Sequence, residues 1–132
     1  MRKRVLVADD EPLTAEMLTL MLTFRGYEVV CARDGREALR VARELKPDII
    51  LMDVLMPGME GDEVTRALRA DAECPPVVLF SSGDEADIGW QEAGADVFLQ
   101  KPIDLVRLPD LLDRLLGQPP DSPRDARRAR IA

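Results

Sequence analysis

The sequence reads Ile49-Ile50-Leu51-Met52-Asp53 near its middle, where four apolar residues are followed by a carboxylate. An apolar run this short predicts a β-strand, and its unbroken hydrophobicity is typical of a strand buried on both faces, as in a parallel sheet. Four further short apolar runs, rich in β-branched residues, have the same character and lie at residues 5–8, 29–32, 77–80 and 97–99. We therefore expect five buried strands.

Apolar residues at helical spacing separate these runs and predict five helices. The expected helical segments are residues 11–25, 34–45, 61–70, 84–93 and 105–116. In the first of them, the buried face is expected to contain Met17, Leu18, Met21 and Leu22. Pro109 either kinks the last helix or marks a later start with proline in the first turn. Strands that alternate with helices over short connections predict a doubly wound α/β fold, with a five-stranded parallel sheet flanked by helices.

Length and charge limit the organisation of the chain. The 132 residues suit one domain, which we assign to residues 1–117, followed by a Pro- and Arg-rich tail at 118–132. The net charge is −7 although the tail is basic, so the domain itself is strongly acidic. An acidic domain argues against nonspecific binding to nucleic acid or membranes. The tail arginines could touch nucleic acid or an acidic partner, although such tails are more often simply solvated.

Two residue types restrict the chemistry and the location. The two cysteines, Cys31 and Cys74, are expected to be reduced thiols in a cytoplasmic protein, with Cys31 in the core. The chain contains no histidine, which excludes Ser-His-Asp and Cys-His catalysis as well as histidine metal sites. Any phosphoryl group transferred here must therefore come from a donor outside the chain.

Polar side chains follow four of the five predicted strands. They are Asp9, Asp10 and Glu11 after the first run, Asp53 after the third, Ser81 after the fourth and Lys101 after the fifth. Taken singly, each has a structural reading, since acidic residues favour a helix N-terminus and serine can cap a helix. Ligands of open α/β sheets, however, bind beyond the carboxyl ends of the strands, so we expect these side chains to form one site.

The chemistry of such a site follows from its groups. Clustered carboxylates repel one another unless protons or a cation neutralise them, and hard oxygen ligands suit Mg²⁺ or Mn²⁺. One carboxylate can attack phosphorus to give an aspartyl phosphate. A lysine, a serine hydroxyl and the metal can then bind the phosphoryl oxygens.

With these residues in place, the chain resembles the receiver domain of two-component response regulators over residues 4–116. The resemblance rests on residues 7–12, 51–61, 80–81, 93–96 and 100–102, and the run from Asp53 to Gly61 is the most specific part. It implies a single-domain response regulator with a flavodoxin-like sheet in strand order 2-1-3-4-5.

The resemblance implies a phosphoacceptor and a set of metal ligands. Asp53 would be the phosphoacceptor. Asp10 would bind Mg²⁺ directly and Asp9 mainly through water, with Asp53 and the backbone carbonyl of Leu55 as further ligands.

The resemblance also implies groups that sense the phosphoryl group. Lys101 would bind it, and the bond from Lys101 to Pro102 is a candidate cis peptide. Ser81 would be the switch hydroxyl. Phe98 occupies the place of the switch aromatic, although plain core packing explains it equally well. The segment from Ser81 to Gly94 is shorter than the family pattern, which puts the output surface in doubt.

The expected function is that of a signalling receiver rather than an enzyme. It would accept a phosphoryl group on Asp53 from a histidine kinase or phosphotransfer protein, with intrinsic phosphotransfer and autodephosphorylation as its own chemistry. The output would pass to a downstream protein, or to a homodimer, through the face of the fourth helix, fifth strand and fifth helix. A Mg²⁺-dependent phosphohydrolase is one alternative, but it often needs an acid two positions after the nucleophile, where Leu55 stands. A second alternative is an adaptor whose binding does not depend on phosphorylation. The intact acidic cluster and Lys101 argue against it.

Overall fold

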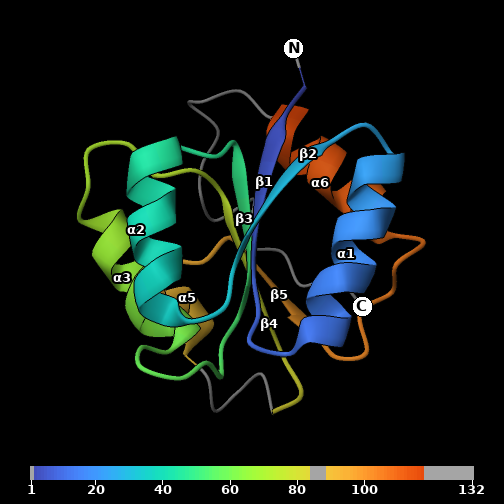
Figure 1. The fold of residues 1–132 in the computed structure, drawn as a ribbon. Helices are drawn as coiled ribbons and strands as arrows, with labels where there is room; N and C mark the ends of the chain where they lie inside the picture. The colour runs from blue at the N-terminus through green and yellow to red at the C-terminus, as the bar shows by residue number, and fades with distance from the viewer. Residues whose placement is uncertain (1, 84–88, 118–132) are drawn as a thin grey trace.

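The computed structural model describes residues 2–83 and 89–117 and contains one parallel sheet between two layers of helices (Figure 1). The strands are β1 (Arg4–Ala8), β2 (Glu28–Ala32), β3 (Ile49–Asp53), β4 (Val77–Ser81) and β5 (Val97–Gln100). The helices are α1 (Pro12–Phe24), α2 (Gly35–Leu45), α3 (Gly61–Arg69), α5 (Trp90–Ala93) and α6 (Leu108–Gly117). The first half of the expected 84–93 helix and the 118–132 tail lie outside the described residues.

The sheet has the order β2-β1-β3-β4-β5, which confirms the predicted doubly wound architecture. All four strand pairs are parallel, with Val7 beside Leu51 and Asp53 beside Phe80. Helices α1 and α6 cover one face, and α2, α3 and α5 cover the other (Figure 1). Because every strand runs in the same direction, the carboxyl ends of all five meet at a single edge of the sheet.

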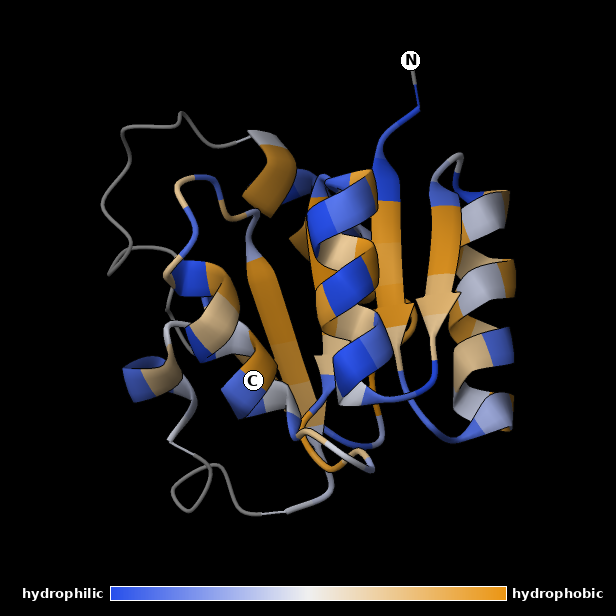
Figure 2. Cartoon of the chain, turned by 60° about the vertical axis from the view of Figure 1, so that its left-hand side comes forward, coloured by the Kyte–Doolittle hydropathy of each residue, from blue (hydrophilic) through white to orange (hydrophobic). Residues whose placement is uncertain are grey.

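The central strands are hydrophobic (Figure 2) and buried, whereas the edge strand β2 is only partly buried. All the side chains of β3 and β4 are buried. Cys31, on β2, is exposed, so the expectation that it lies in the core is wrong. The reason is that β2 pairs with one strand and lacks a second neighbour. Among the described helices, none is long and apolar enough to cross a membrane.

Local sequence explains where the helices start. The Asp34 carboxylate accepts a hydrogen bond from the Glu37 backbone N–H at 2.8 Å, which caps α2. Glu60 and Glu63 form a reciprocal capping box at the start of α3. Helix α6 begins at Leu108 rather than at residue 105, with Pro109 in its first turn. The structure therefore selects the late start, because proline at the first turn has no N–H that the helix needs.

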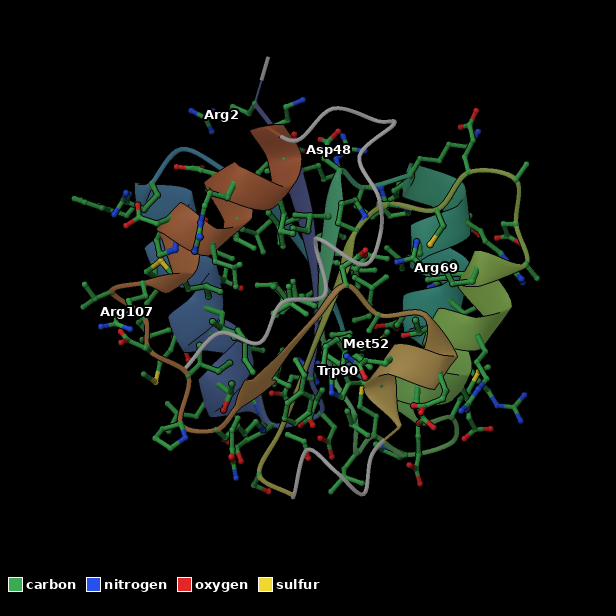
Figure 3. The ribbon with its side chains drawn as sticks, turned by 180° about the vertical axis from the view of Figure 1, so that it is seen from behind. Arg2, Asp48, Met52, Arg69, Trp90 and Arg107 are labelled. Carbon is green, nitrogen blue, oxygen red and sulfur yellow. The ribbon has the colours of Figure 1, made fainter. Side chains whose placement is uncertain are left out.

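The short helix α5 and strand β5 are held in place by a buried ion pair. The Arg69 guanidinium lies 2.6 Å from the Asp96 carboxylate and donates a second hydrogen bond to the Gly94 carbonyl. Arg69 extends from α3, on the same side of the sheet as Trp90 of α5 (Figure 3). Trp90 is buried and stacks on Phe98, with ring centroids 6.3 Å apart. Phe98 is therefore part of the core.

Candidate functional site

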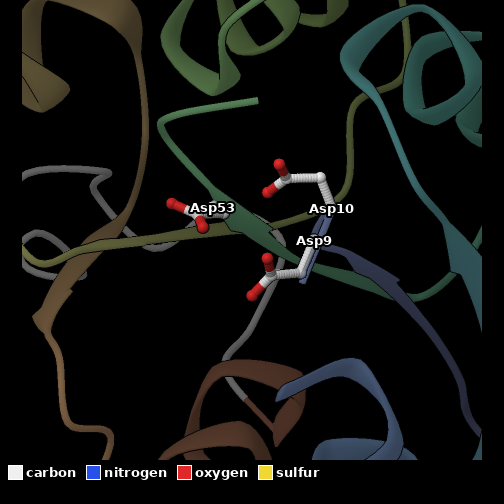
Figure 4. A group of neighbouring side chains, drawn as sticks. All are labelled: Asp9, Asp10 and Asp53. Carbon is white, nitrogen blue, oxygen red and sulfur yellow. The ribbon is translucent and has the colours of Figure 1, made fainter. Parts of the chain in front are cut away.

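Three carboxylates meet at the carboxyl edge of the sheet. Asp53 ends β3, while Asp9 and Asp10 directly follow β1 (Figure 4). Each offers an oxygen atom, and these oxygens all lie within 4.8 Å of one another. Asp9 and Asp53 are buried and Asp10 is exposed. The structure thus brings together the acidic residues that the sequence pattern predicted for one site.

Lys101 supplies the positive charge beside two of these carboxylates. Its Nζ donates a hydrogen bond to Asp53 Oδ2 at 3.0 Å and lies 3.6 Å from Asp9 Oδ2. The ammonium group also lies 5.4 Å from the centroid of the Phe80 ring, within the range of a cation–π contact. Burial disfavours the charge on Lys101, but the hydrogen bond and the charge of Asp53 outweigh it and raise the pKa of the lysine. Lys101 is therefore charged at neutral pH.

Asp9 is a buried carboxylate with one oxygen in a hydrogen bond and the other in an ion pair with Lys101. Its Oδ1 accepts a hydrogen bond from the Glu11 backbone N–H at 2.9 Å, whereas its buried Oδ2 accepts no hydrogen bond from the described residues. Burial raises the pKa of Asp9 to about 6, and the neighbouring charge of Asp53 adds to this effect although the Glu11 N–H opposes it. A crowded group of oxygen ligands with a buried acceptor to spare fits a hard divalent cation such as Mg²⁺.

The remaining predicted residues surround Asp53 in different ways. Asp53 Oδ1 accepts a hydrogen bond from the Leu55 backbone N–H at 3.1 Å, which holds the loop after β3 against the carboxylate. Ser81 ends β4 and is buried, and its Oγ accepts a hydrogen bond from the Gly83 N–H at 3.0 Å. The peptide bond from Lys101 to Pro102 is cis, as predicted. The switch role of Phe98 stays a prediction, since its ring is buried against Trp90 in the core.

A hollow beside the site was not anticipated from the sequence. It has a volume of about 450 Å³ and lies between α1 and the segment after β5, with Lys101 at its rim. Met17 lines it and is 46% exposed, so the expectation that Met17 belongs to the buried face of α1 is wrong. Leu18 and Leu22 alone bury fully because α1 turns a narrow stripe towards the sheet.

The raised pKa of Asp9 predicts how stability depends on pH when no metal is bound. The folded-state pKa of about 6 exceeds the ordinary 3.8, so the free energy of unfolding should fall as pH rises through this interval and level off above it. The loss should be about 3 kcal/mol. Asp9→Asn should remove most of this dependence and stabilise the metal-free protein at pH 7.

Urea denaturation with a chelator, repeated from acidic to neutral pH, measures this dependence. Wild type and Asp9→Asn should be equally stable at the acidic end, where Asp9 is protonated. If the free energy of unfolding changes with pH in the same way for both proteins, the Asp9 charge does not destabilise the fold.

Comparisons with known proteins agree with this geometry. A family model described as the response regulator receiver domain matches residues 5–113. The DNA-binding response regulator MtrA of Mycolicibacterium smegmatis is 46% identical over 103 residues, which cover 77% of this chain and 45% of MtrA. Protein PilH of Pseudomonas aeruginosa is 39% identical over 105 residues, covering 76% of this chain and 87% of PilH. The chain thus spans less than half the length of MtrA but most of PilH.

Solved structures give the same result. The chemotaxis response regulator CheY4 of Vibrio cholerae superposes with a TM-score of 0.81 at 33% identity, covering 87% of this chain and 99% of that chain. A putative response regulator from Chloroflexus aurantiacus superposes with a TM-score of 0.83 at 34% identity, covering 89% of this chain and 100% of that one. With the strand order and the acidic cluster already in place, the conclusion is that this chain belongs to the response regulator receiver domain family.

Proposed function

We propose that the chain is a phosphoacceptor receiver that takes a phosphoryl group on Asp53 in two-component signalling. The observation that carries the proposal is the position of Lys101, whose Nζ contacts Asp53 at 3.0 Å and Asp9 at 3.6 Å inside a group of three carboxylates. The ammonium group therefore lies where it can bind an oxygen of a phosphoryl group attached to Asp53.

The transfer can be written from the residues present. An Asp53 oxygen attacks phosphorus, the bond to the donor nitrogen breaks, and that nitrogen keeps the electron pair and takes a proton from water. Lys101 then exchanges its hydrogen bond to Asp53 Oδ2 for one to a phosphoryl oxygen, and Ser81 can donate its hydroxyl to another. Bound Mg²⁺ would offset the charge that builds up on the phosphoryl oxygens. Asp10, Asp9, Asp53 and the Leu55 carbonyl would hold it.

The proposal also covers the phosphoryl donor and the cellular compartment. A histidine kinase or phosphotransfer protein would supply the phosphoryl group, because the chain has no histidine of its own. Response regulator receivers are signalling proteins, and we propose that autodephosphorylation is the only hydrolysis this one performs. We place it in the cytoplasm, where its two reduced cysteines would persist. MtrA is named as DNA-binding, but nucleic acid is not the partner we propose for this acidic domain.

A phosphohydrolase is less consistent with the same site. Such an enzyme would need an acid–base group near Asp53 to protonate the leaving alcohol and activate water. The side chain two positions further on is Leu55, which is apolar and exposed. Hydrolysis of many equivalents of a phosphoester substrate per protein molecule would favour the hydrolase over the receiver.

Mg²⁺ binding is expected to depend on Asp10. Asp10→Ala removes an exposed carboxylate from the cluster, so the affinity for Mg²⁺ should fall by at least about 10-fold, while the fold is retained. Calorimetric titration of the metal measures this, with Trp90 fluorescence as a second signal. Asp104→Ala, which removes an exposed carboxylate at another place, is the control and should bind Mg²⁺ like wild type. Equal affinity in Asp10→Ala and wild type would mean that the metal binds elsewhere.

The output face is expected to include α5, β5 and α6, and to reach a downstream protein or a second copy of the domain. Ser81 ends β4, so a phosphoryl oxygen that draws its hydroxyl inward will disturb the segment leading to Trp90. Because Phe98 is already buried against Trp90, we expect a smaller change there than an exposed aromatic would give. Amide hydrogen exchange of residues 82–98, with and without a phosphoryl mimic, checks this. A change confined to another surface would move the output face there.

A further inference from the structure

The aromatic ring of Phe80 lies against the charged end of Lys101. The lysine Nζ lies over the ring, 5.4 Å from its centroid. The face of an aromatic ring carries a negative electrostatic potential and attracts a cation within about 6 Å. The attraction strengthens where water is excluded, and here Phe80 is fully buried while the Lys101 side chain is 23% exposed. The ammonium group therefore has an uncharged partner in addition to its two carboxylates.

The register of the sheet explains why this ring meets this lysine. In the sheet, Phe80 of β4 lies between Asp53 of β3 and Leu99 of β5. The backbone N–H of Lys101 donates a hydrogen bond to the Ser81 carbonyl at 2.8 Å, so the pairing with β4 continues as far as Lys101. Because side chains alternate between the two faces of a sheet, Lys101 returns to the face that Leu99 and Phe80 share. The ring is thus placed beside both Asp53 and Lys101.

Phosphoryl transfer changes the contact of Lys101 with Asp53 but not its contact with the ring. Lys101 Nζ donates a hydrogen bond to Asp53 Oδ2 at 3.0 Å, and must donate to a phosphoryl oxygen once Asp53 is modified. Asp9 remains nearby, but its Oδ2 lies 3.6 Å from Nζ and accepts no hydrogen bond from the described residues. The potential of the Phe80 ring is the same before and after the transfer. The ring can therefore hold the ammonium group while its hydrogen bond changes partner.

From these contacts we propose that Phe80 is a positioning residue for phosphoryl transfer, whose ring face holds the Lys101 ammonium group where it binds a phosphoryl oxygen on Asp53. This role rests on the proposed function of Asp53 as the phosphoacceptor. Phe80 also fills space in the core, together with Leu18 and Leu51 of the same hydrophobic cluster. The two roles can be separated, because packing depends on the shape of the ring whereas the attraction for a cation depends on its electron density.

Fluorination of the Phe80 ring tests the positioning role with little change of shape. Each fluorine atom withdraws electrons from the ring face and weakens its attraction for a cation. The full chain is prepared with phenylalanine that carries one, two or three ring fluorines in place of Phe80. Phosphoryl uptake from a small donor with Mg²⁺ should slow with each fluorine, by about 3- to 10-fold for the trifluorinated ring. The same trifluorinated residue in place of Phe24, which is 89% exposed, is the control and should leave the rate unchanged.

Nuclear magnetic resonance checks the contact independently of the reaction. The ring current of Phe80 should shift the side-chain proton resonances of Lys101 upfield, and this shift should be absent in Phe80→Leu, which has no ring. The chain contains three lysines, so the resonances of Lys101 are readily distinguished.

Two results would overturn the positioning role. One is an uptake rate that does not fall with the number of fluorines in variants that urea denaturation shows to be folded. The other is a set of Lys101 resonances that is the same in wild type and Phe80→Leu. Failure of the wild-type protein to take up any phosphoryl group would instead contradict the proposed function, and the positioning role with it.

Discussion

Asp53→Asn is expected to reduce phosphoryl uptake to background, a loss of at least about 100-fold. The amide lacks the anionic oxygen that attacks phosphorus, and the neighbouring Asp9 is poorly placed to replace it. Asp9 is buried beside Lys101, with one oxygen engaged by the Glu11 N–H. The amide oxygen can still accept the Leu55 N–H, so the loop after β3 should keep its position. The variant should therefore fold normally and fail in the chemistry alone.

Uptake from a small phosphodonor in the presence of Mg²⁺ measures this effect, with the intact mass of the protein as the readout. Asp110→Asn makes the same chemical change on the exposed side of α6 and should take up phosphate like wild type. Circular dichroism of Asp53→Asn should match that of wild type, because the amide keeps the hydrogen bond from the Leu55 N–H. A variant that is inactive because it is unfolded would fail this second measurement.

Gly35→Ala is expected to cause the largest loss of stability among single methyl additions to the described glycines. A Cβ at Gly35 would lie 1.8 Å from the carbonyl oxygen of Met59, which is backbone and cannot turn aside. The start of α2 and the loop before α3 must then separate. We expect the free energy of unfolding to fall by about 2–4 kcal/mol, as measured by urea denaturation.

The control for this change is Gly117→Ala, at the end of α6, where an added Cβ would meet no atom within 4 Å. It should leave stability within about 0.5 kcal/mol of wild type. Because Met59 belongs to the loop that leaves Asp53, Gly35→Ala should also slow phosphoryl uptake in the fraction that remains folded. Equal stability of the two alanine variants would mean that the loop can move away from α2 without cost.

The features that depend on local sequence pattern could be predicted from the sequence. Short apolar runs predict buried strands, and parallel strands necessarily end at one edge, so the meeting of Asp9, Asp10 and Asp53 followed from their places after the first and third strands. Pro109 limited α6 to two possible starts, because proline is tolerated in a first turn and disruptive later. These expectations required no knowledge of how distant segments pack.

The failures concern contacts between distant segments. Cys31 lies in an apolar run, but its exposure depends on β2 being at the edge of the sheet, and a single strand's sequence does not reveal that position. Met17 has helical spacing with Met21, yet which side of α1 is covered depends on the sheet and α6. The need for Gly35 arises from a loop more than 20 residues away, so no local turn signal marks it.

The most direct test of the proposed function is to locate the phosphoryl group on the unmodified protein. The full chain is incubated with a small phosphodonor, with Mg²⁺ or with a chelator, and the modified residue is identified by mass spectrometry of its peptides. The geometry around Lys101 predicts a single phosphoryl group on Asp53, formed with Mg²⁺ and absent with the chelator. A phosphoryl group found on any other residue, or formed equally well without the metal, would contradict the proposal that this acidic cluster is a phosphoacceptor site.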